Sequence, residues 1–309
     1  MSVTNAPVSR DALPPIDPMA AITVSRKTGM NNNQWLQHEI ASRMAQRLSF
    51  IRQHPQRWMD WEPLSGGLSA LGQVQAIYPR AQVIQLQPDA TDLIKVMQAR
   101  KPPWWQFWKK QDLQYDTSPL HAVDMVWSNL RLHQHADPLS LMKAWCEALN
   151  PQGFVMFSCL GPDSLQELRE VYKQHQWPEP HHAFTDMHDW GDMLLQAGFT
   201  QPVMDMERLT LTYQSAADLL RDLRAWGRNL HPQRFPGTRT KGWRQDLLNA
   251  LESARNSEQH PGKLTLSFEI IYGHAFKAAP THAVKPLTRV ELSDMKQMLR
   301  SGQSAGNRT

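Results

Sequence analysis

A polar segment between two apolar ones is the first candidate for chemistry in this sequence. It reads Glu-Pro-Leu-Ser-Gly-Gly over residues 62–67, after an apolar stretch that ends at Asp60 and before a helical pattern that begins near Leu68. In α/β proteins a glycine-containing turn between a strand and a helix often binds a phosphate or a nucleotide, because glycine lets the backbone approach a ligand closely. The segment is therefore a working cofactor loop, a cofactor loop that has decayed, or a simple turn.

Two histidines and an amide follow another apolar stretch. His133 and His135 lie just beyond residues 122–128, which read as a buried strand, and Asn129 lies at the end of that strand. Ligands of open α/β sheets bind at the carboxyl ends of the strands. His133 is thus a catalytic candidate that orients a carboxyl group or moves a proton, and the alternative is a surface histidine.

Residues 181–190, "HHAFTDMHDW", contain three histidines and two aspartates. Their spacing matches no established pattern of metal ligands. Asp186 is also well placed to cap a helix that runs to Ala197, where Gly198 ends it. We therefore expect no metal ion at this segment.

The elements that would position these residues follow from the spacing of apolar side chains. Strands alternate with helices and end in strand pairs, which predicts an α/β fold with a mostly parallel sheet wrapped by helices. The predicted strands are 57–61, 82–87, 122–128, 154–160, 203–213 and 263–277. The predicted helices are 36–51, 68–78, 90–99, one that starts at Asp137 and Pro138, one after a turn within 161–172, 186–197 and 215–227.

The composition is that of a globular protein, with 41% apolar and 20% charged residues in a chain of 309. We expect a flexible arm at 1–30, a main domain at 31–280 and a basic, disordered tail at 281–309. No apolar run approaches the roughly 18 residues that a membrane-spanning helix needs. Cys146 and Cys159 are the two cysteines, and we expect both to be buried in a protein of the reducing cytoplasm.

Two surface features suggest partners. Between residues 221 and 244 seven arginines and lysines stand against one acidic residue, Asp222. This excess of positive charge suits an acidic partner, although a solvated helix face would look the same. Residues 101–110, "KPPWWQFWKK", place Trp104, Trp105 and Trp108 among lysines. This segment folds back on its own domain, or contacts a membrane surface or a protein partner, with nucleic acid as a weaker alternative.

Several longer stretches resemble a known family. "VDMVWSNLRLH" from residue 123 and "MKAWCEALNPQGFVMFSCLGPDSLQELREV" from residue 142 are similar to class I S-adenosylmethionine-dependent methyltransferases. Together with "FTDMHDWGDMLLQAGFTQPVMDMERLTLTY" and "LLRDLRAWGRN", they resemble, within that class, the malonyl-acyl-carrier-protein O-methyltransferases of biotin synthesis. The resemblance runs from about residue 16 to residue 277.

This resemblance implies a Rossmann-like sheet of seven mostly parallel strands with helices on both faces, and a helical elaboration at about 214–260 on the substrate side. It implies that S-adenosyl-L-methionine methylates the free carboxyl of a malonyl group on an acidic acyl carrier protein, with residues 181–190 as a substrate-facing lid. The implied cofactor-binding residues are Asp60, Gly66, Gly67, Gln87 and Asn129, and the implied substrate or partner residues are His188, Tyr213, Arg221, Arg224 and Arg228.

The chain departs from the family at the cofactor loop. The pattern Asp-x-Gly-x-Gly-x-Gly keeps Asp60 and Gly66 but meets Glu62 and Leu64 at its first two glycines. Gln87 stands where an acidic residue would bind the ribose hydroxyls. We expect Glu62 to bring negative charge towards the cofactor's carboxylate. Two functions therefore stay open: an active methyltransferase, or a non-catalytic descendant that keeps a carrier-binding or assembly surface.

Overall fold

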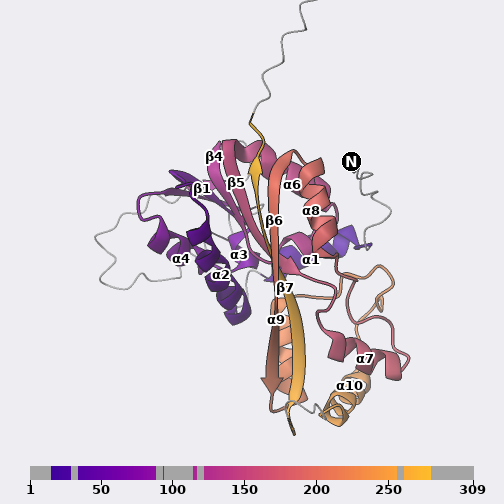
Figure 1. Cartoon of the computed structure of the whole chain (residues 1–309). Coiled ribbons are helices and arrows are strands. Elements are labelled where there is room, and N and C mark those ends of the chain that lie inside the picture. Colours follow the sequence, from indigo (N-terminus) through magenta and orange to yellow (C-terminus); the bar gives the residue numbers. More distant parts are fainter. Residues whose placement is uncertain are drawn as a thin grey trace, which may run out of the picture. The chain divides into compact units, whose positions relative to one another are not determined.

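A computed structural model of the chain describes residues 15–28, 34–87, 93, 114–116, 122–255 and 261–279 (Figure 1). The chain divides into two compact units, Met1–Ala278 and Ala279–Thr309, and every element below belongs to the first. The tryptophan-rich segment at 101–110 and, apart from residue 93, the predicted helix at 90–99 lie outside the described residues.

Seven strands form one mixed sheet in the order β3-β2-β1-β4-β5-β7-β6. The first five in this order pair in parallel, and β7 pairs antiparallel with both β5 and β6. The strands are β1 (Arg57–Trp61), β2 (Gln82–Leu86), β3 (Gln114–Asp116), β4 (Val123–Ser128), β5 (Leu149–Leu160), β6 (Phe199–Tyr213) and β7 (Leu264–Lys277). The α/β fold with a seven-stranded, mostly parallel sheet is thereby confirmed.

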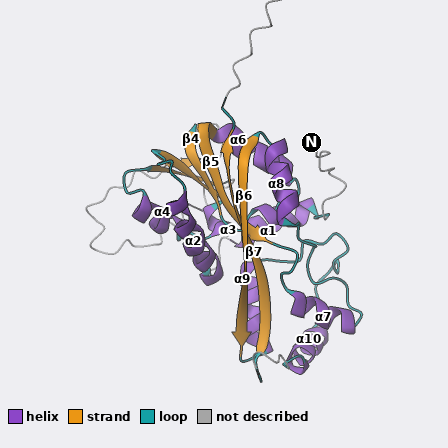
Figure 2. Cartoon of the chain, viewed as in Figure 1, coloured by secondary structure: helices purple, strands orange, loops and turns teal. Residues whose placement is uncertain are grey.

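Helices cover both faces of the sheet, as the resemblance implied (Figure 2). On one face lie α2 (Trp35–Arg47) and α4 (Ala70–Ile77), and on the other lie α6 (Pro138–Ala148) and α8 (Met187–Gln196). Adjacent residues of β1 point to opposite faces, so Trp58 packs with α2 and Met59 packs with α6 and α8. Both faces of β1, β4 and β5 are therefore buried, which explains their almost continuous apolar sequence.

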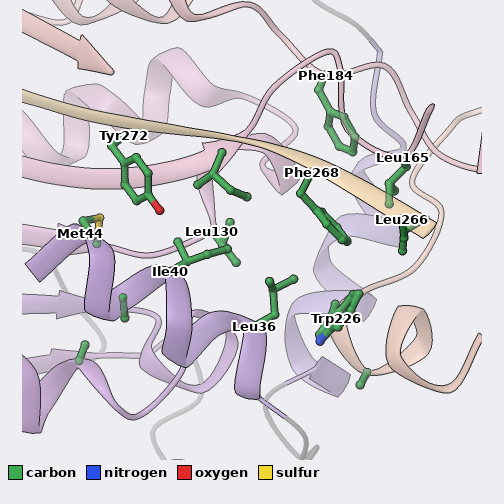
Figure 3. Close-up of a cluster of buried hydrophobic side chains, with 14 of the residues drawn as sticks. Leu36, Ile40, Met44, Leu130, Leu165, Phe184, Trp226, Leu266, Phe268 and Tyr272 are labelled. Carbon is green, nitrogen blue, oxygen red and sulfur yellow. The ribbon is translucent and has the colours of Figure 1, made fainter. Parts of the chain in front are cut away.

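The last two strands are long and carry a helical roof. β6 and β7 extend well past the rest of the sheet, with α9 (Ala216–Trp226) alongside the extension and α7 (Gln166–Gln174) and α10 (Lys241–Ser253) to one side of it (Figure 1). Trp226 of α9 and Phe268 of β7 belong to the same core cluster as Leu36 of α2, and their rings meet edge-to-face (Figure 3). One continuous core thus joins the sheet to its roof.

The N-terminal segment differs from the expectation of a flexible arm at 1–30. Residues Pro18–Thr28 form helix α1. The side chain of Asp17 accepts the backbone N–H groups of Met19 and Ala20 and pairs with Arg234 at 2.6 Å, and Val24 is buried. The Asp17 cap and its ion pair with the distant Arg234 stabilise this segment, and neither could be inferred from the composition of residues 1–30. Within the described part of the chain no helix is long and apolar enough to cross a membrane.

Candidate functional site

The direction of the chain through the sheet changes between β1 and β4. From β1 the chain continues outward to β2 and β3, and from β4 it continues the other way to β5, while β1 and β4 are parallel neighbours. In open α/β sheets the crevice at the carboxyl ends of such a strand pair binds ligands. Here the residues that follow the two strands are Glu62 and Asn129–Arg131.

The loop after β1 is not an open glycine turn. Glu62 adopts a left-handed conformation with φ 54°, and residues 63–66 form a one-turn helix, α3 (Pro63–Gly66). Each backbone N–H of the loop is used inside the protein. The acceptors are Leu86 O for Glu62, Gln87 Oε1 for Leu64, Glu62 O for Ser65 and Gly66, and Pro63 O for Gly67. In this conformation the loop therefore does not form the backbone-amide cradle that a glycine-rich cofactor loop provides.

The side chains around the loop are also engaged. Leu64 packs with Leu68 and Leu93 in a small buried cluster. Gln87 is buried, with its Oε1 on the loop backbone. Asn129 donates through Nδ2 to Gln37 O at 2.8 Å and to Gly66 O at 2.5 Å, and its Oδ1 accepts from Ser158. The binding roles that the resemblance implies for Gln87 and Asn129 stay predictions, since both side chains now bond the protein.

Gly66 and Gly67 are required by close packing in the loop. A Cβ on Gly66 would lie 2.8 Å from Asn129 O, and a Cβ on Gly67 would lie 2.8 Å from the Cβ of Gln37. Gly67 also has φ 96°, which side chains disfavour. The second half of the glycine motif thus brings the loop against β4 and α2.

Glu62 does not present an unbalanced negative charge, contrary to the sequence expectation. Its Oε2 accepts from Arg131 Nε at 2.9 Å and Nη2 at 2.7 Å. The side chains of Arg131 and Glu62 are only 5% and 10% exposed, and Arg131 Nη1 also donates to Gln134. The guanidinium neutralises the carboxylate, so the expected repulsion of a ligand carboxylate is corrected to a buried pair of opposite charges.

Asp60, the residue two positions before the loop, is almost fully buried. It is buried beside Gln85 of β2, its partner in the strand register. Burial raises the pKa of Asp60 to about 7, and the side chain of Gln85 lowers it in part. Asp60 is therefore a buried acid that is only partly ionised near pH 7. Its cofactor-binding role stays a prediction.

A cavity of about 270 Å³ opens between the roof and the carboxyl ends of β4 and β5. Leu223 and Trp226 of α9, Trp243 of α10 and Tyr172 of α7 line it, and His133 and Leu160 line its sheet side. Arg224, Arg228 and Arg244 are also among its lining residues, whereas none of the described lining residues is acidic. The cavity combines apolar walls with positive charge, which suits an anionic group on an apolar or flexible chain.

His133 lies in the cavity wall as a neutral imidazole. Burial lowers its pKa well below the usual value, and the charges of His182 and Arg131 lower it further. Its Nδ1 accepts the backbone N–H of Leu160 at 3.2 Å. Its Nε2 lies 3.4 Å from the side-chain nitrogen of Gln134, so both ring nitrogens already face a nitrogen of the protein. Because its pKa is lowered and its Nδ1 is engaged, His133 is poorly placed to act as a general base.

The five residues predicted to contact the substrate or a partner do not lie together in the structure. Arg224 and Arg228 line the cavity, and burial together with the charge of Arg224 lowers the pKa of Arg228. Arg221 is exposed and pairs with Asp218 at 2.7 Å. Tyr213 is buried and donates to Asp222 at 3.4 Å, and His188 is 80% exposed and pairs with Asp186, the cap of α8. Of these five residues, only the two cavity arginines line the cavity.

Other residues of the site were not singled out from the sequence. The cavity residues Trp226, Trp243 and Arg244 come from the roof, and the sequence gives no sign that α9 and α10 face the same space. Arg131 had a detectable signal, because it follows a predicted buried strand just as Glu62 does. Two opposite charges at the ends of neighbouring strands predict an ion pair once the strand order is known. Among the described residues no cluster of His, Cys, Asp or Glu could hold a metal ion.

Comparison with known proteins gives consistent results. The chain is 39% identical to a malonyl-[acyl-carrier protein] O-methyltransferase of Gallionella capsiferriformans over 82% of this chain and 87% of the relative. It is 36% identical to the protein of that name from Methylovorus sp. over 84% and 85%, and 34% identical to that from Laribacter hongkongensis over 79% and 83%. No family model matches.

Solved structures agree on the fold. A proposed methyltransferase of Bacillus halodurans aligns with a TM-score of 0.50 at 16% identity, covering 77% of this chain and all of that one. The [4+2]-cyclase SpnF aligns with a TM-score of 0.50 at 12% identity, covering 86% of this chain and 98% of that one. Since one of these two proteins is described as a cyclase, the shared fold alone does not fix the reaction.

Proposed function

The chain belongs to the family of malonyl-[acyl-carrier protein] O-methyltransferases, and we propose that it transfers a methyl group to the free carboxyl of a malonyl group held by an acyl carrier protein. S-adenosyl-L-methionine is the donor that the resemblance implies, and it supplies an electrophilic methyl group. The observation that carries the proposal is the cavity under the roof, with its three arginines and no acidic residue among the described lining.

The chemistry of the cavity suits this acceptor. A malonyl carboxyl is ionised at neutral pH, as other carboxyls are, so it is a nucleophile without the help of a base. Neutral His133, whose Nδ1 is engaged by Leu160, is compatible with such a reaction. The work left to the protein is to orient the carboxylate and to exclude water. Arg224 and Arg228 have the charge and geometry for the first task, and the aromatic walls serve the second.

The acidic carrier protein would meet the same face. Arg221 lies one turn before Arg224 on α9, is exposed, and is outside the cavity lining. Charges of this kind mainly raise the rate of encounter between partners. We infer that α9 and the residues just after it have two roles, with Arg221 facing the carrier protein and Arg224 and Arg228 facing its malonyl group.

The test compares carriers that differ in one group. Purified chain is incubated with S-adenosyl-L-methionine and either malonyl-loaded or acetyl-loaded acyl carrier protein, and methyl ester formation is followed by mass spectrometry. We expect transfer to the malonyl carrier alone. The double variant Arg224→Gln/Arg228→Gln is expected to raise KM for the malonyl carrier at least tenfold. Arg80→Gln is the matched control. Arg80 is exposed in the turn before β2, at the amino ends of the parallel strands, whereas the cavity lies at their carboxyl ends.

Two results would contradict the proposal. One is the absence of methyl ester on the malonyl carrier at saturating donor. The other is equal loss of activity in the double variant and in Arg80→Gln, which would mean that net charge, not the cavity, governs substrate use.

A further inference from the structure

Three aromatic side chains form a cluster where α7 and α10 meet at one side of the roof (Figure 1). The rings of Tyr172, Trp177 and Trp243 contact one another, with centroids 5.3 to 6.4 Å apart. Tyr172 belongs to α7 and Trp243 to α10, and both line the cavity under the roof. The aromatic cluster is therefore part of the cavity wall and also joins the two helices.

The guanidinium of Arg239 rests on this cluster. Its Cζ lies 4.4 Å from the ring centroid of Trp243 and 3.8 Å from that of Phe235. Burial raises the pKa of the Tyr172 hydroxyl, and the positive charge of Arg239 lowers that pKa in part, so the guanidinium lies near this hydroxyl as well. Contacts with two rings restrict the side chain of Arg239 and hold its charge in place before a ligand arrives.

The hydrogen-bond donors of Arg239 are not used within the described part of the chain. Stacking on rings occupies the faces of a guanidinium and leaves its N–H groups at the edge. Among the described residues no carboxylate pairs with Arg239 and no oxygen accepts a hydrogen bond from its side chain, whereas Arg234 in the same loop pairs with Asp17. No acidic residue occurs from 223 to 245. Arg239 is thus an ordered cation that suits an external anion.

Positive charge continues from Arg239 into the cavity. Arg244 directly follows Trp243, is exposed and lines the cavity, and no described residue accepts a hydrogen bond from its side chain. Arg228, which also lines the cavity, donates to two backbone carbonyls at the end of α9. Arg239 is not itself among the lining residues, so its charge lies next to the cavity and not inside it.

This arrangement matches a ligand with two anionic groups separated by an uncharged chain. A malonyl group on an acyl carrier protein is such a ligand, because the acyl group is attached through a phosphopantetheine arm. The carboxylate lies at one end of the loaded arm, and a phosphodiester joins the other end to the carrier. The planar N–H fork of arginine fits the oxygens of a phosphate, with two parallel hydrogen bonds.

We propose that Arg239, held on the rings of Phe235 and Trp243, binds the phosphodiester of the carrier's arm. The uncharged part of the arm then lies along the apolar walls of the cavity, and its malonyl end reaches Arg224 and Arg228. The inference rests on the proposed function, since it presumes an acceptor attached to a carrier protein. It also explains why aromatic rings hold Arg239, because a carboxylate of the protein would compete with the phosphate for the same donors.

Binding of two arm fragments tests the proposal without any methyl transfer. Pantetheine and 4′-phosphopantetheine differ only in the phosphate, and ligand-observed NMR titrations give both dissociation constants. We expect wild-type protein to bind 4′-phosphopantetheine about tenfold more tightly than pantetheine, as suits a charge-assisted hydrogen bond. Arg239→Gln should remove most of this preference and leave pantetheine binding unchanged. Arg80→Gln, at an exposed arginine before β2, is the control and should keep the full preference.

Two further variants test the stacked geometry. Arg239→Lys keeps the charge but not the planar fork, so we expect an intermediate preference for the phosphorylated fragment. Phe235 is 43% exposed, so Phe235→Leu should leave the melting temperature nearly unchanged while it lowers the preference a few-fold. If both variants keep the full preference, the stacked guanidinium does not bind the phosphate, and the proposal is overturned.

Three other results would also overturn the proposal. One is equal binding of the two fragments by wild-type protein, or binding of neither. Another is an equal loss of preference in Arg239→Gln and Arg80→Gln, which would mean that net charge alone attracts the phosphate. The third is binding of inorganic phosphate as tightly as 4′-phosphopantetheine, which would show a general anion site that does not recognise the arm.

These outcomes are separate from those of the proposed function. A chain that methylates the malonyl carrier but binds both fragments equally loses only the phosphate site. A chain that prefers 4′-phosphopantetheine as expected but forms no methyl ester on the malonyl carrier loses only the proposed reaction.

Discussion

Two regions at the same edge of the sheet use polar groups in opposite ways. In the loop of residues 62–67 every backbone donor is bonded within the protein, and the charged pair Glu62–Arg131 is closed on itself. In the cavity under the roof the cations Arg224, Arg228 and Arg244 line about 270 Å³ of open space. The cavity under the roof is therefore open in this structure, whereas the loop is closed by its own hydrogen bonds, and the following four experiments test this contrast.

Loss of Arg131 should have the largest effect on stability. Removal of one partner from a buried ion pair costs about 3–5 kcal/mol, because the other charge stays in a poor environment. We expect Arg131→Gln to lower the free energy of unfolding by this amount in urea titrations, and Glu62→Gln/Arg131→Gln to recover most of it. Arg208→Gln, which breaks an exposed pair, should cost less than about 1 kcal/mol. If Arg131→Gln and Arg208→Gln lower the free energy of unfolding by similar amounts, the Glu62–Arg131 pair is not effectively buried.

The second prediction concerns Asp60, behind the loop. Its pKa is raised by burial from 3.8 to about 7. Between pH 4 and pH 7 the unfolded chain is ionised at this position while the folded chain keeps the proton. The unfolded state then binds fewer protons, so this group makes stability fall as the pH rises through that window, by up to about 4 kcal/mol.

Asp60→Asn should remove this dependence, because an amide of similar shape stays neutral. We expect the variant to be more stable than wild type at pH 8 and nearly equal to it at pH 4, as measured by thermal unfolding at both pH values. A stability difference that stays constant from pH 4 to pH 8 would mean that Asp60 titrates as it does in the unfolded chain.

The third prediction fills the cavity. Leu223 lines it from α9, and Leu223→Trp should occupy part of the open space. We expect KM for the malonyl carrier to rise about tenfold, equivalent to roughly 1.4 kcal/mol, with little loss of thermal stability. Leu195→Trp, at a half-exposed position of α8, is the control for added bulk. A strong loss of stability in Leu223→Trp would show that the cavity is tightly packed in solution.

The smallest effect is expected at Arg221. Its exposed pair with Asp218 contributes little to stability, so Arg221→Glu should change the unfolding free energy by less than about 0.5 kcal/mol. The association rate with the carrier protein should fall a few-fold at low salt and recover at about 0.5 M salt, where the Debye length is only a few ångströms. A loss of association that persists at high salt would place Arg221 in a buried contact.

Periodicity predicted the framework of this fold well because strand and helix patterns are local. β1 matches its predicted range, and the predicted caps Asp137 and Asp186 accept the expected backbone bonds. β5 and β6 begin several residues earlier than predicted, at Leu149 and Phe199. In both strands the early residues include proline and polar side chains, and pairing with a neighbouring strand outweighs local propensity there.

The site was harder to predict because its contacts are distant in sequence. Gly66 and Gly67 were recognised as a loop, but their packing against Asn129 and Gln37 depends on how α2 lies on the sheet. The negative charge of Glu62 was expected to repel a ligand carboxylate, but the guanidinium of Arg131 neutralises it. Asp222 was counted among surface charges, yet it is buried and accepts bonds from Trp35 and Tyr213. In each case the sequence identified a residue of interest but could not identify the distant residue that it contacts.

The order of the last strands has a consequence for synthesis of the chain on the ribosome. Among the described strands β6 neighbours β7 alone, and β7 also separates it from β5. Until residues 264–277 emerge, β6 therefore has no described strand to pair with and β5 stays an open edge. At roughly 5–20 residues per second, the segment between the two strands delays closure by several seconds. A nascent chain stalled before β7 should therefore depend on chaperones, while one stalled shortly after it should already resist proteolysis.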